Sequence, residues 1–340
     1  MPLKRKIITD YAYQTEQIIV KVSVCVITFN QEIYIAQCLE SILAQKCEFA
    51  FEVVIRDDFS LDNTIQIIRS YQNKFPKIVR LLNAEENIGA NRNLLTVFSW
   101  ARGDYLAICE GDDYWLDDNK LQKQIDLMER YPEITFTSHA CRIHNKNGLA
   151  GVEYVKAPGS VVVTCNEVLE VSGQFAPTAS YVFSKDLPKK LPSWFVHAPV
   201  GDFFIEMYGI SMGKGMHMPD VMSAYRTSSI NSWTTQNNEG NSRNLVNFSE
   251  KMIHCLKQMQ TDPIFKGLDF SRKLGAAYFN IAVGSLLLRD FSKFQNSIAA
   301  CYDSFPGLSL TQRILYNLQQ FPLIAYSLYG IRHRIERRYI

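Results

Sequence analysis

Residues 105–115 read YLAICEGDDYW and join an apolar run to an acidic cluster. The run 105–109 has the length and composition of a buried strand. Glu110, Asp112 and Asp113 follow it within a span of four positions. Carboxylates packed together at a strand end repel one another unless a positive charge lies among them. The stretch therefore predicts either a divalent-cation site with oxygen ligands or a solvated acidic turn that caps the next helix.

The chain before this cluster alternates between strand and helix patterns. Short apolar, β-branched segments predict the strands, and amphipathic segments between them predict the helices. The predicted strands are 22–27, 51–55, 79–82 and 105–109, and the predicted helices are 33–44, 64–72 and one that ends near residue 100. This alternation is typical of right-handed β-α-β units. The sequence predicts an α/β fold with a mostly parallel central sheet flanked by helices.

Polar residues follow three of the predicted strands. They occupy positions 28–30, positions 57–58 and the cluster at 110–113. In open parallel sheets, ligands bind at the carboxyl ends of the strands. The sequence has no glycine-rich phosphate loop of either common type, so a phosphate-bearing ligand would need a metal bridge. This favours the cation interpretation of the acidic cluster.

The pattern becomes more mixed after residue 115. The predicted helices here are 118–130, 164–171 and 201–212, with Asp202 as a candidate N-cap of the last. The predicted strands are 134–143, 161–163, 178–183 and 220–225, and positions 145–148 predict a turn. From about residue 241 only helices are predicted. Residues 1–20 are expected to be an extension that precedes the domain.

Composition excludes several classes of protein. The chain of 340 residues is 47% hydrophobic with a net charge of +2, which predicts a globular protein without general affinity for nucleic acid. Its eight cysteines are scattered and form no C-x-x-C pair, which is typical of a reduced, cytoplasmic protein. The charged N-terminus lacks the apolar core of a signal peptide. No stretch reaches the roughly 18 apolar residues of a membrane span.

Four segments occur in the order found in family 2 glycosyltransferases of the GT-A fold, and the sequence resembles that family over residues 21–235. Residues 22–45 (VSVCVITFNQEIYIAQCLESILAQ) resemble its first strand, loop and helix. Residues 53–64 (VVIRDDFSLDNT) resemble its D-D-G-S-x-D-x-T motif, and NIGANRN followed by ARGDYLAICEGDDYW resembles the approach to its D-x-D metal motif. Residues 199–226, which end in Tyr225-Arg226, resemble its later G-D or E-D segment.

The resemblance implies a Rossmann-like GT-A domain with a nucleotide-binding half at 21–115 and an acceptor-binding half at 116–235. It implies that Asp58 hydrogen-bonds the uracil edge of a UDP donor, or the equivalent edge of another base. Thr28, Phe29 and Asn30 would line the base pocket. Arg92 would lie near the diphosphate or the ribose. Residues 236–340 fall outside the motifs and are expected to form a helical C-terminal region.

The resemblance also implies a metal site and a catalytic base. Asp113, Asp112 and Glu110 would hold Mn²⁺ or Mg²⁺, with Asp112 also near the ribose and Glu110 in place of the first Asp of the common motif. Asp202 would take the proton from the attacking acceptor hydroxyl, and a single displacement with one base implies inversion at the anomeric carbon. The run Tyr225-Arg226-Thr227-Ser228 departs from the common Y-R-x-H form. The ion is therefore expected to rest mainly on Asp113 and the diphosphate.

The C-terminal tail carries an apolar segment at 315–331, followed by basic residues. An apolar helix with a basic end is compatible with a peripheral contact of residues 313–340 with the inner face of the plasma membrane. The alternatives, packing on the catalytic domain and a homodimer contact, are favoured. The function implied is a metal-dependent inverting glycosyltransferase. It would move a sugar from a nucleotide-sugar, with UDP favoured, to a saccharide or lipid-linked acceptor in bacterial surface polysaccharide synthesis.

Two other functions remain open. A sugar nucleotidyltransferase uses a metal on a similar sheet, but it normally needs a glycine-rich basic loop that residues 24–30 do not supply. A non-catalytic module that binds nucleotide-sugars would explain the donor residues without a base. The simultaneous presence of Asp58, Asp112, Asp113 and Asp202 argues against that module.

Overall fold

The computed structural model describes residues 19–171, 173–227, 229 and 242–336. Its strands form one sheet in the order β3-β2-β1-β4-β9-β6-β10-β5, with β7 paired to β6 and β8 paired to β10. The strands are β1 (Val22–Thr28), β2 (Phe51–Asp57), β3 (Val79–Leu82), β4 (Tyr105–Ile108), β5 (Tyr114–Trp115), β6 (Ile134–Asn145), β7 (Gly148–Glu153), β8 (Val161–Val163), β9 (Val182–Ser184) and β10 (Lys214–Arg226).

Helices cover both faces of this sheet. In the first 211 residues they are α1 (Ile35–Leu43), α2 (Thr64–Lys74), α3 (Ala90–Trp100), α4 (Lys120–Arg130), α5 (Cys165–Glu170) and α6 (Asp202–Ser211). The C-terminal helices are α8 (Ser242–Thr261), α9 (Ser271–Leu287), α10 (Phe291–Ser304), α11 (Leu310–Asn317) and α12 (Pro322–Glu336). Short 3-10 turns lie at η1 (Thr178–Ser180), η2 (Leu187–Lys189), η3 (Ser193–His197) and η4 (Pro263–Phe265).

The sheet is parallel in its first half and mixed in its second. β1 pairs in parallel with β2 and β4, and β2 pairs in parallel with β3. β9 then runs antiparallel between β4 and β6, while β10 runs parallel to β6. The carboxyl ends of β1, β2 and β4 therefore meet at one edge, as expected from the sequence. The prediction of a mostly parallel sheet describes only this first half.

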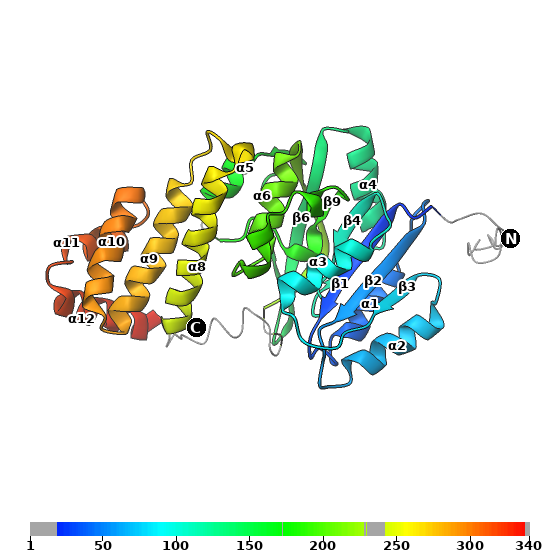
Figure 1. Cartoon of the computed structure of the whole chain (residues 1–340), viewed down its shortest axis with the longest axis horizontal. Coiled ribbons are helices and arrows are strands. Elements are labelled where there is room, and N and C mark those ends of the chain that lie inside the picture. The colour runs from blue at the N-terminus through cyan, green and yellow to red at the C-terminus, as the bar shows by residue number, and fades with distance from the viewer. Residues whose placement is uncertain (1–18, 172, 228, 230–241, 337–340) are drawn as a thin grey trace.

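Alternating side chains of β1 pack into two separate hydrophobic cores, one on each face of the sheet. Val22, Val24 and Val26 pack with α1, α2 and α4 on one face. Cys25 points the other way, into a core shared with α3, α5 and α6. Figure 1 shows this arrangement, with α3 and α6 on the viewer's side of the sheet. This alternation has the two-residue period of a β-strand, and both sets of side chains are apolar enough for the strand to be buried on both faces.

The structure corrects several predicted elements in the second half. The strand predicted at 220–225 is the end of β10, which begins at Lys214 and has register shifts on either side of Val221. These irregularities accommodate Pro219, which cannot donate to a regular ladder. Residues 178–180 form the turn η1 rather than a strand, and β9 follows it. β5 and β7 were not predicted, although Gly148 does lie in the expected turn, with φ +98°.

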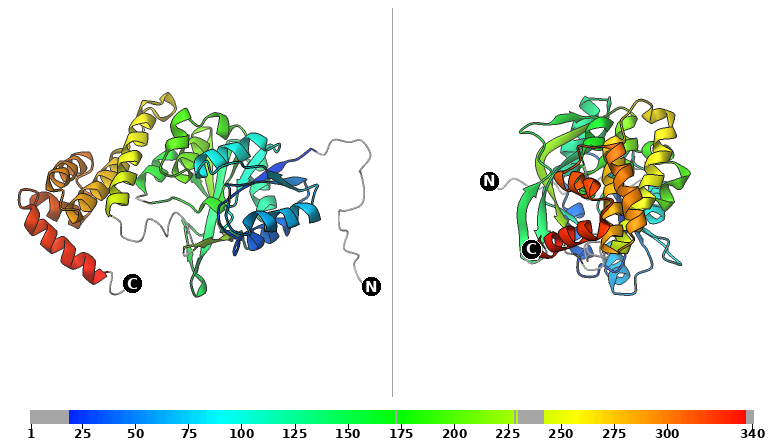
Figure 2. Two further views of the ribbon diagram at one scale, coloured as in Figure 1. Left: turned by 60° about the horizontal axis from the view of Figure 1, so that its bottom comes forward. Right: turned by 90° about the vertical axis from the view of Figure 1, so that its left-hand side faces the viewer.

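The C-terminal helices extend the molecule from the side of α5 and α6 (Figures 1 and 2). Cys255, Leu256 and Met259 of α8 belong to the same hydrophobic core as α6. Farther out, α9 to α12 form a core of their own around Leu286, Phe294 and Leu315. α8 thus joins the C-terminal helices to α6, whereas α11 and α12, which contain the tail segment 315–331, pack on α9 and α10.

Several predictions fall outside the described residues. They concern the extension before residue 19, the boundary at 235, Ser228, and the side chains of the basic tail from 331 onward. In the part of the chain that the structure describes, no helix is long and apolar enough to cross a membrane. All eight cysteines are free thiols, and seven of them are buried.

Candidate active site

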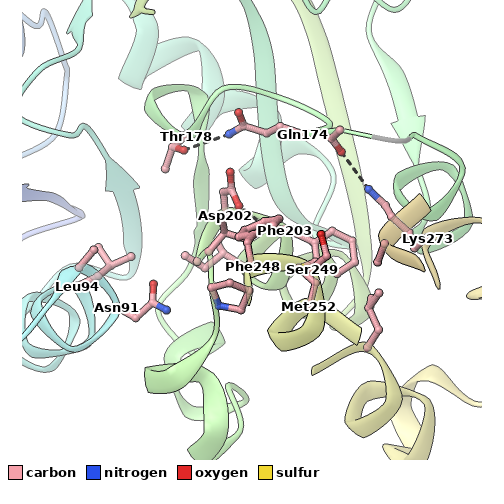
Figure 3. A pocket seen from close by; sticks show the side chains of 18 of the residues that line it. Asn91, Leu94, Gln174, Thr178, Asp202, Phe203, Phe248, Ser249, Met252 and Lys273 are labelled. Carbon is pink, nitrogen blue, oxygen red and sulfur yellow. Dashed lines mark hydrogen bonds between the residues drawn. The ribbon is translucent and has the colours of Figure 1, made fainter. Parts of the chain in front are cut away.

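The ends of the parallel strands and the start of α6 border one cavity of about 440 Å³. Its lining includes Glu110 after β4, Asn91 on α3, and Asp202 and Phe203 at the start of α6. Met252 of α8 and Lys273 of α9 line it as well. Figure 3 shows Asp202 between the α3 residues on one side and Met252 and Lys273 on the other. The cavity is therefore shared by the sheet edge and the C-terminal helices.

Two loops at the sheet edge are joined by hydrogen bonds. The Asn30 amide donates to Ser60 Oγ at 2.8 Å, and Asn30 Oδ1 accepts from the Leu61 amide at 2.8 Å. Asn30 and Phe59 both have left-handed backbone conformations, with φ of +52° and +69°, which is unusual for a residue as bulky as Phe59. Phe29 and Phe59 remain 39% and 49% exposed. The joined loops thus present two aromatic rings to solvent, and only Phe29 was predicted.

Asp58 is buried, and its carboxylate accepts three hydrogen bonds from its neighbours. Its Oδ1 accepts from Arg56 Nη1 at 2.6 Å and from the Ile88 amide at 3.0 Å, and its Oδ2 accepts from the Gly89 amide at 2.9 Å. Arg56 also donates to Asn93 Oδ1 at 3.1 Å. A carboxylate has about four acceptor positions, so one remains for a further donor. Arg56, which the sequence did not single out, is the buried partner of this carboxylate.

Gly111 fits tightly beneath the acidic cluster. A Cβ at this position would lie 2.4 Å from Gln31 Oε1 and 2.8 Å from Thr28 Oγ1. Thr28 is itself buried, and its hydroxyl has no hydrogen-bond partner among the described residues. The Thr28 side chain therefore packs directly against Gly111 of the turn 110–113. The glycine lets the strand end and the first loop come into contact.

The three carboxylates of the cluster point in different directions. Glu110 lines the cavity, and Asp112 Oδ2 accepts from Ser229 Oγ at 2.7 Å. Asp113 is buried, and its Oδ1 accepts from the Arg226 amide at 2.9 Å. Arg226 also donates to the Asp112 carbonyl through its guanidinium. Arg226, the last residue of the Tyr-Arg motif, thus fixes the position of the acidic turn.

The cluster carries more negative charge than its surroundings stabilise. Burial, with repulsion from Asp112 and Asp202, raises the pKa of Glu110 to about 8. Burial and the same kind of repulsion raise the pKa of Asp113 well above its usual range. Burial also raises the pKa of Asp112, although the hydrogen bond from Ser229 and the charge of Arg226 oppose it. A bound cation would favour the ionised form of all three groups.

The residues present fit a divalent cation that takes only part of its ligands from protein. Asp113 Oδ2 is buried and has no hydrogen-bond partner in the part of the chain that the structure describes. Across the described residues, no group of three or more His, Cys, Asp and Glu side chains could hold a metal by itself. Mg²⁺ in phosphate-binding sites commonly uses one or two carboxylates, with phosphate oxygens and water completing the shell. Asp113 and Asp112 could supply that share.

Asp202 is half-buried at the start of α6. Its Oδ1 accepts from the Phe203 amide at 2.6 Å, and the N-cap position belongs to Gly201 rather than to Asp202. Burial raises the pKa of Asp202, and the Lys273 ammonium on α9 opposes that rise. A carboxylate that faces a cavity and has a raised pKa is suited to accept a proton. Asp202 therefore lines the cavity, and its role as a base stays a prediction.

Lys273 and Glu206 complete a buried charge cluster that the sequence did not reveal. Glu206 lies one turn after Asp202, and it accepts from Tyr181 Oη at 2.6 Å and from the Ala176 amide at 3.0 Å. Burial, with repulsion from Asp202, raises the pKa of Glu206 to about 8. Lys273 donates to the Gly173 carbonyl at 2.9 Å, and burial lowers its pKa to about 8. The four-residue spacing from Asp202 on α6 is a signal from which Glu206 could have been predicted. No nearby sequence feature indicates Lys273, which lies on α9.

Arg92 is exposed on α3, whereas its neighbour Asn91 lines the cavity. Asn91 Nδ2 donates to the carbonyls of Phe195 and Ala198 at 3.1 and 2.9 Å. Asn91 thereby links α3 to the segment that precedes α6. The structure brings Glu110 and Asp202 together in the cavity, while Asp58 and Asp113 lie in buried networks beside it.

Comparison with known proteins identifies the first part of the chain. Residues 23–153 match the family described as Glycosyl transferase family 2. An uncharacterized protein of Mycobacterium tuberculosis is 33% identical over 216 residues, which is 62% of this chain and 60% of that relative. The chain therefore spans well under two thirds of the length of this relative. TarS of Staphylococcus aureus, a poly(ribitol-phosphate) beta-N-acetylglucosaminyltransferase, is 38% identical over 96 residues, covering 28% of this chain and 16% of TarS.

Solved structures share the whole architecture at low sequence identity. TarS residues 1–349 in complex with UDP-GlcNAc superpose with a TM-score of 0.64 and 16% identity, covering 94% of this chain and 92% of that one. A mannosyltransferase from Pyrobaculum calidifontis, solved with GDP-Man and Mn²⁺, gives a TM-score of 0.52 and 18% identity, covering 92% of this chain and 87% of that one. These likenesses show the fold. Residues 23–153 are thus similar to glycosyl transferase family 2, and the α/β architecture of the chain is the GT-A fold.

Proposed function

We propose that this protein is a metal-dependent, inverting glycosyltransferase that uses a nucleotide-sugar donor. The observation that carries the proposal is the placement of Glu110, from the acidic strand end, and Asp202, a candidate base, on one cavity. The similarity to structures titled as complexes with UDP-GlcNAc and with GDP-Man and Mn²⁺ supports a nucleotide-sugar and a divalent cation. A UDP-sugar is the favoured donor.

The donor would bind across the first half of the sheet. Phe29, with Thr28 and Asn30 behind it, would pack on the base, and the remaining acceptor position of Asp58 would take a base N–H. Asp112 would contact the ribose or the ion, and Arg92 would lie near the diphosphate. Asp113, with Asp112, would hold Mn²⁺ or Mg²⁺, and Glu110 would border the ion from the cavity side. A bound ion would offset the charge that develops on the departing diphosphate, which is worth several kcal/mol.

The acceptor hydroxyl would attack from the side of Asp202. Its proton would pass to an Asp202 carboxylate oxygen as the new bond to the anomeric carbon forms and the bond to the diphosphate breaks. One base and one displacement give inversion. General-base catalysis of this kind typically contributes about 10²–10⁴-fold to the rate.

The acceptor would be a saccharide or a lipid-linked saccharide used in surface polysaccharide synthesis in a bacterial cytoplasm. A peripheral membrane contact through 313–340 is supported by the outer face of α11 and α12. Leu323, Ile324 and Leu328 of α12 and Ile314 of α11 are 43–67% exposed there. The division of the chain at residues 20, 115 and 235, and a homodimer built through the same region, are further proposals.

The direct test compares wild type with Asp202→Asn and Asp113→Asn. Release of nucleoside diphosphate from a panel of nucleotide-sugars would be measured with Mn²⁺ and with EDTA, with and without saccharide acceptors. We expect wild type to release the diphosphate from one donor only with metal, and both variants to lose transfer to acceptor by about 10²-fold or more. Full activity of Asp202→Asn would overturn the assignment of the base.

A further inference from the structure

The cavity has a wall that belongs to neither the family motifs nor the sheet. Phe248, Met252 and Leu256 recur every four residues on α8 and line it together. Lys273, Ala276, Ala277 and Asn280 follow a three-four spacing on α9 and line it as well. Residues at these spacings share one face of a helix. The two helices therefore each turn one stripe toward Asp202, and we call these stripes the α8–α9 wall.

The chemistry of the α8–α9 wall is mainly apolar. Between Lys273 and Asn280 the α9 stripe consists of alanines, whose small side chains leave the space open. On α8, a phenylalanine, a methionine and a leucine face that space. Protein interiors are close-packed, so an apolar cavity of this size beside a candidate base is typical of a ligand site rather than of a core.

The position of Asp202 indicates whether the donor or the acceptor would contact the α8–α9 wall. Asn91 and Leu94 of α3 lie on one side of Asp202, and Met252 and Lys273 lie on the other (Figure 3). The sheet edge, on the side of α3, is where the donor would bind. A base must lie beside the hydroxyl that it deprotonates, so the acceptor would approach from the α8–α9 side.

We infer, on the basis of the proposed function, that the α8–α9 wall is an acceptor subsite for a glycoside with an apolar aglycone. A sugar ring with hydroxyls on every side would leave them unpaired against Phe248, Met252 and Leu256, and unpaired buried hydroxyls are costly. An alkyl or isoprenoid-like group buries against the same residues favourably. Ser249 Oγ is buried in this wall without a hydrogen-bond partner among the described residues, and it could donate to the glycosidic oxygen.

The test measures binding of matched glycosides to the full chain by calorimetry. The probes are methyl and hexyl glycosides of glucose, galactose, mannose and N-acetylglucosamine, each below its micelle concentration. We expect at least one hexyl glycoside to bind one-to-one with a Kd about tenfold or more below that of its methyl partner. That is the gain from burying roughly two methylene groups. Equal affinity within all four pairs would overturn the inference.

Two variants of the wall localise the effect. Ala276→Leu should fill the space and reduce the hexyl preference to below about threefold, and Met252→Gln should weaken it by making the wall polar at nearly constant volume. Ala299→Leu on α10, a half-buried alanine outside the cavity lining, is the matched control and should keep the preference. A preference that survives both wall variants, each folded by circular dichroism, would also overturn the inference.

The same proteins separate this inference from the proposed function. Nucleotide-sugar binding by thermal shift does not depend on the α8–α9 wall and should be unchanged in Ala276→Leu. If a hexyl glycoside binds one-to-one at the wall but no nucleotide-sugar binds, the apolar glycoside site is supported, and the glycosyltransferase proposal and the acceptor role both fail. If nucleotide-sugars bind and no hexyl preference is seen, only the subsite fails.

Discussion

Asp202 and Lys273 are opposite charges contributed to one cavity by distant parts of the chain. The sequence indicated Asp202 because it lies in a recognisable segment. It did not indicate Lys273, because a lysine on an amphipathic helix is usually solvated, and only the docking of α9 buries it. Asp202, the candidate base, could therefore be proposed from the sequence, whereas the nearby positive charge of Lys273 could not.

Replacing Lys273 with methionine should change the pH profile of the enzyme. Burial raises the pKa of Asp202 and the Lys273 ammonium opposes this, so without the ammonium the pKa of Asp202 should rise further. The base must be ionised to accept a proton. The acid limb of kcat/KM for sugar transfer should therefore move to higher pH, with the largest loss at low pH.

Two companion variants separate charge from packing at this position. Lys273→Arg keeps the positive charge and should restore most of the wild-type profile. Lys257→Met, which removes an exposed lysine of α8, should leave it unchanged. A uniform loss of rate at every pH in Lys273→Met would indicate a purely structural role.

Asp58 illustrates a residue whose structural role is as strong as the proposed functional one. Asp58→Ala should leave Arg56 buried without its carboxylate partner, at a cost of about 3–5 kcal/mol in the free energy of unfolding. Urea denaturation measures this cost. Asp104→Ala, which breaks an exposed pair with Lys185, should have little effect on the midpoint. A small change in Asp58→Ala would mean that the Arg56 pair contributes little to the fold.

At the scale of elements, the strand ends were predictable and the edges of the sheet were not. The parallel strands β1, β2, β3 and β4 are apolar runs between helices, so periodicity predicts them. β10 has 13 residues, but Pro219 and Asp220 interrupt its apolar pattern, so the sequence predicted only a short strand at 220–225. β7 has mostly exposed residues and no buried face that a pattern could reveal. The half of the sheet that would bind the nucleotide was therefore predicted better than the half that would bind the acceptor.

The turn between β4 and β5 depends on the absence of a side chain at Gly111. Gly111→Ala should force Gln31 and Thr28 apart and lower the free energy of unfolding by about 1–3 kcal/mol. It should also weaken metal-dependent binding, because the turn carries Asp112 and Asp113. Gly151→Ala in β7 is the control, since its Cβ would meet no atom within 4 Å. Equal stability of the two variants would show that the contact at Gly111 relaxes freely.

At the scale of the whole molecule, the C-terminal helices are part of the site rather than an appendage. α8 shares the core of α6, and α9 brings Lys273 to the cavity. The sequence predicted helices here and suggested a role only for the tail at 313–340, because helix–helix docking leaves no short motif that would indicate a part in the cavity. The order of motifs predicted the fold and the donor edge, whereas the cavity itself depends on contacts between residues far apart in the chain.

The proposed function depends above all on binding of a nucleotide-sugar together with a divalent cation. The thermal midpoint of the full chain would be measured against a panel of nucleotide-sugars, each with Mn²⁺ and with EDTA. A ligand that binds only the folded state at 100 times its Kd stabilises it by about 2.7 kcal/mol. We expect such a rise for one nucleotide-sugar, only with Mn²⁺, and its loss in Asp113→Asn. Stabilisation by no nucleotide-sugar, or by one equally in EDTA, would contradict it.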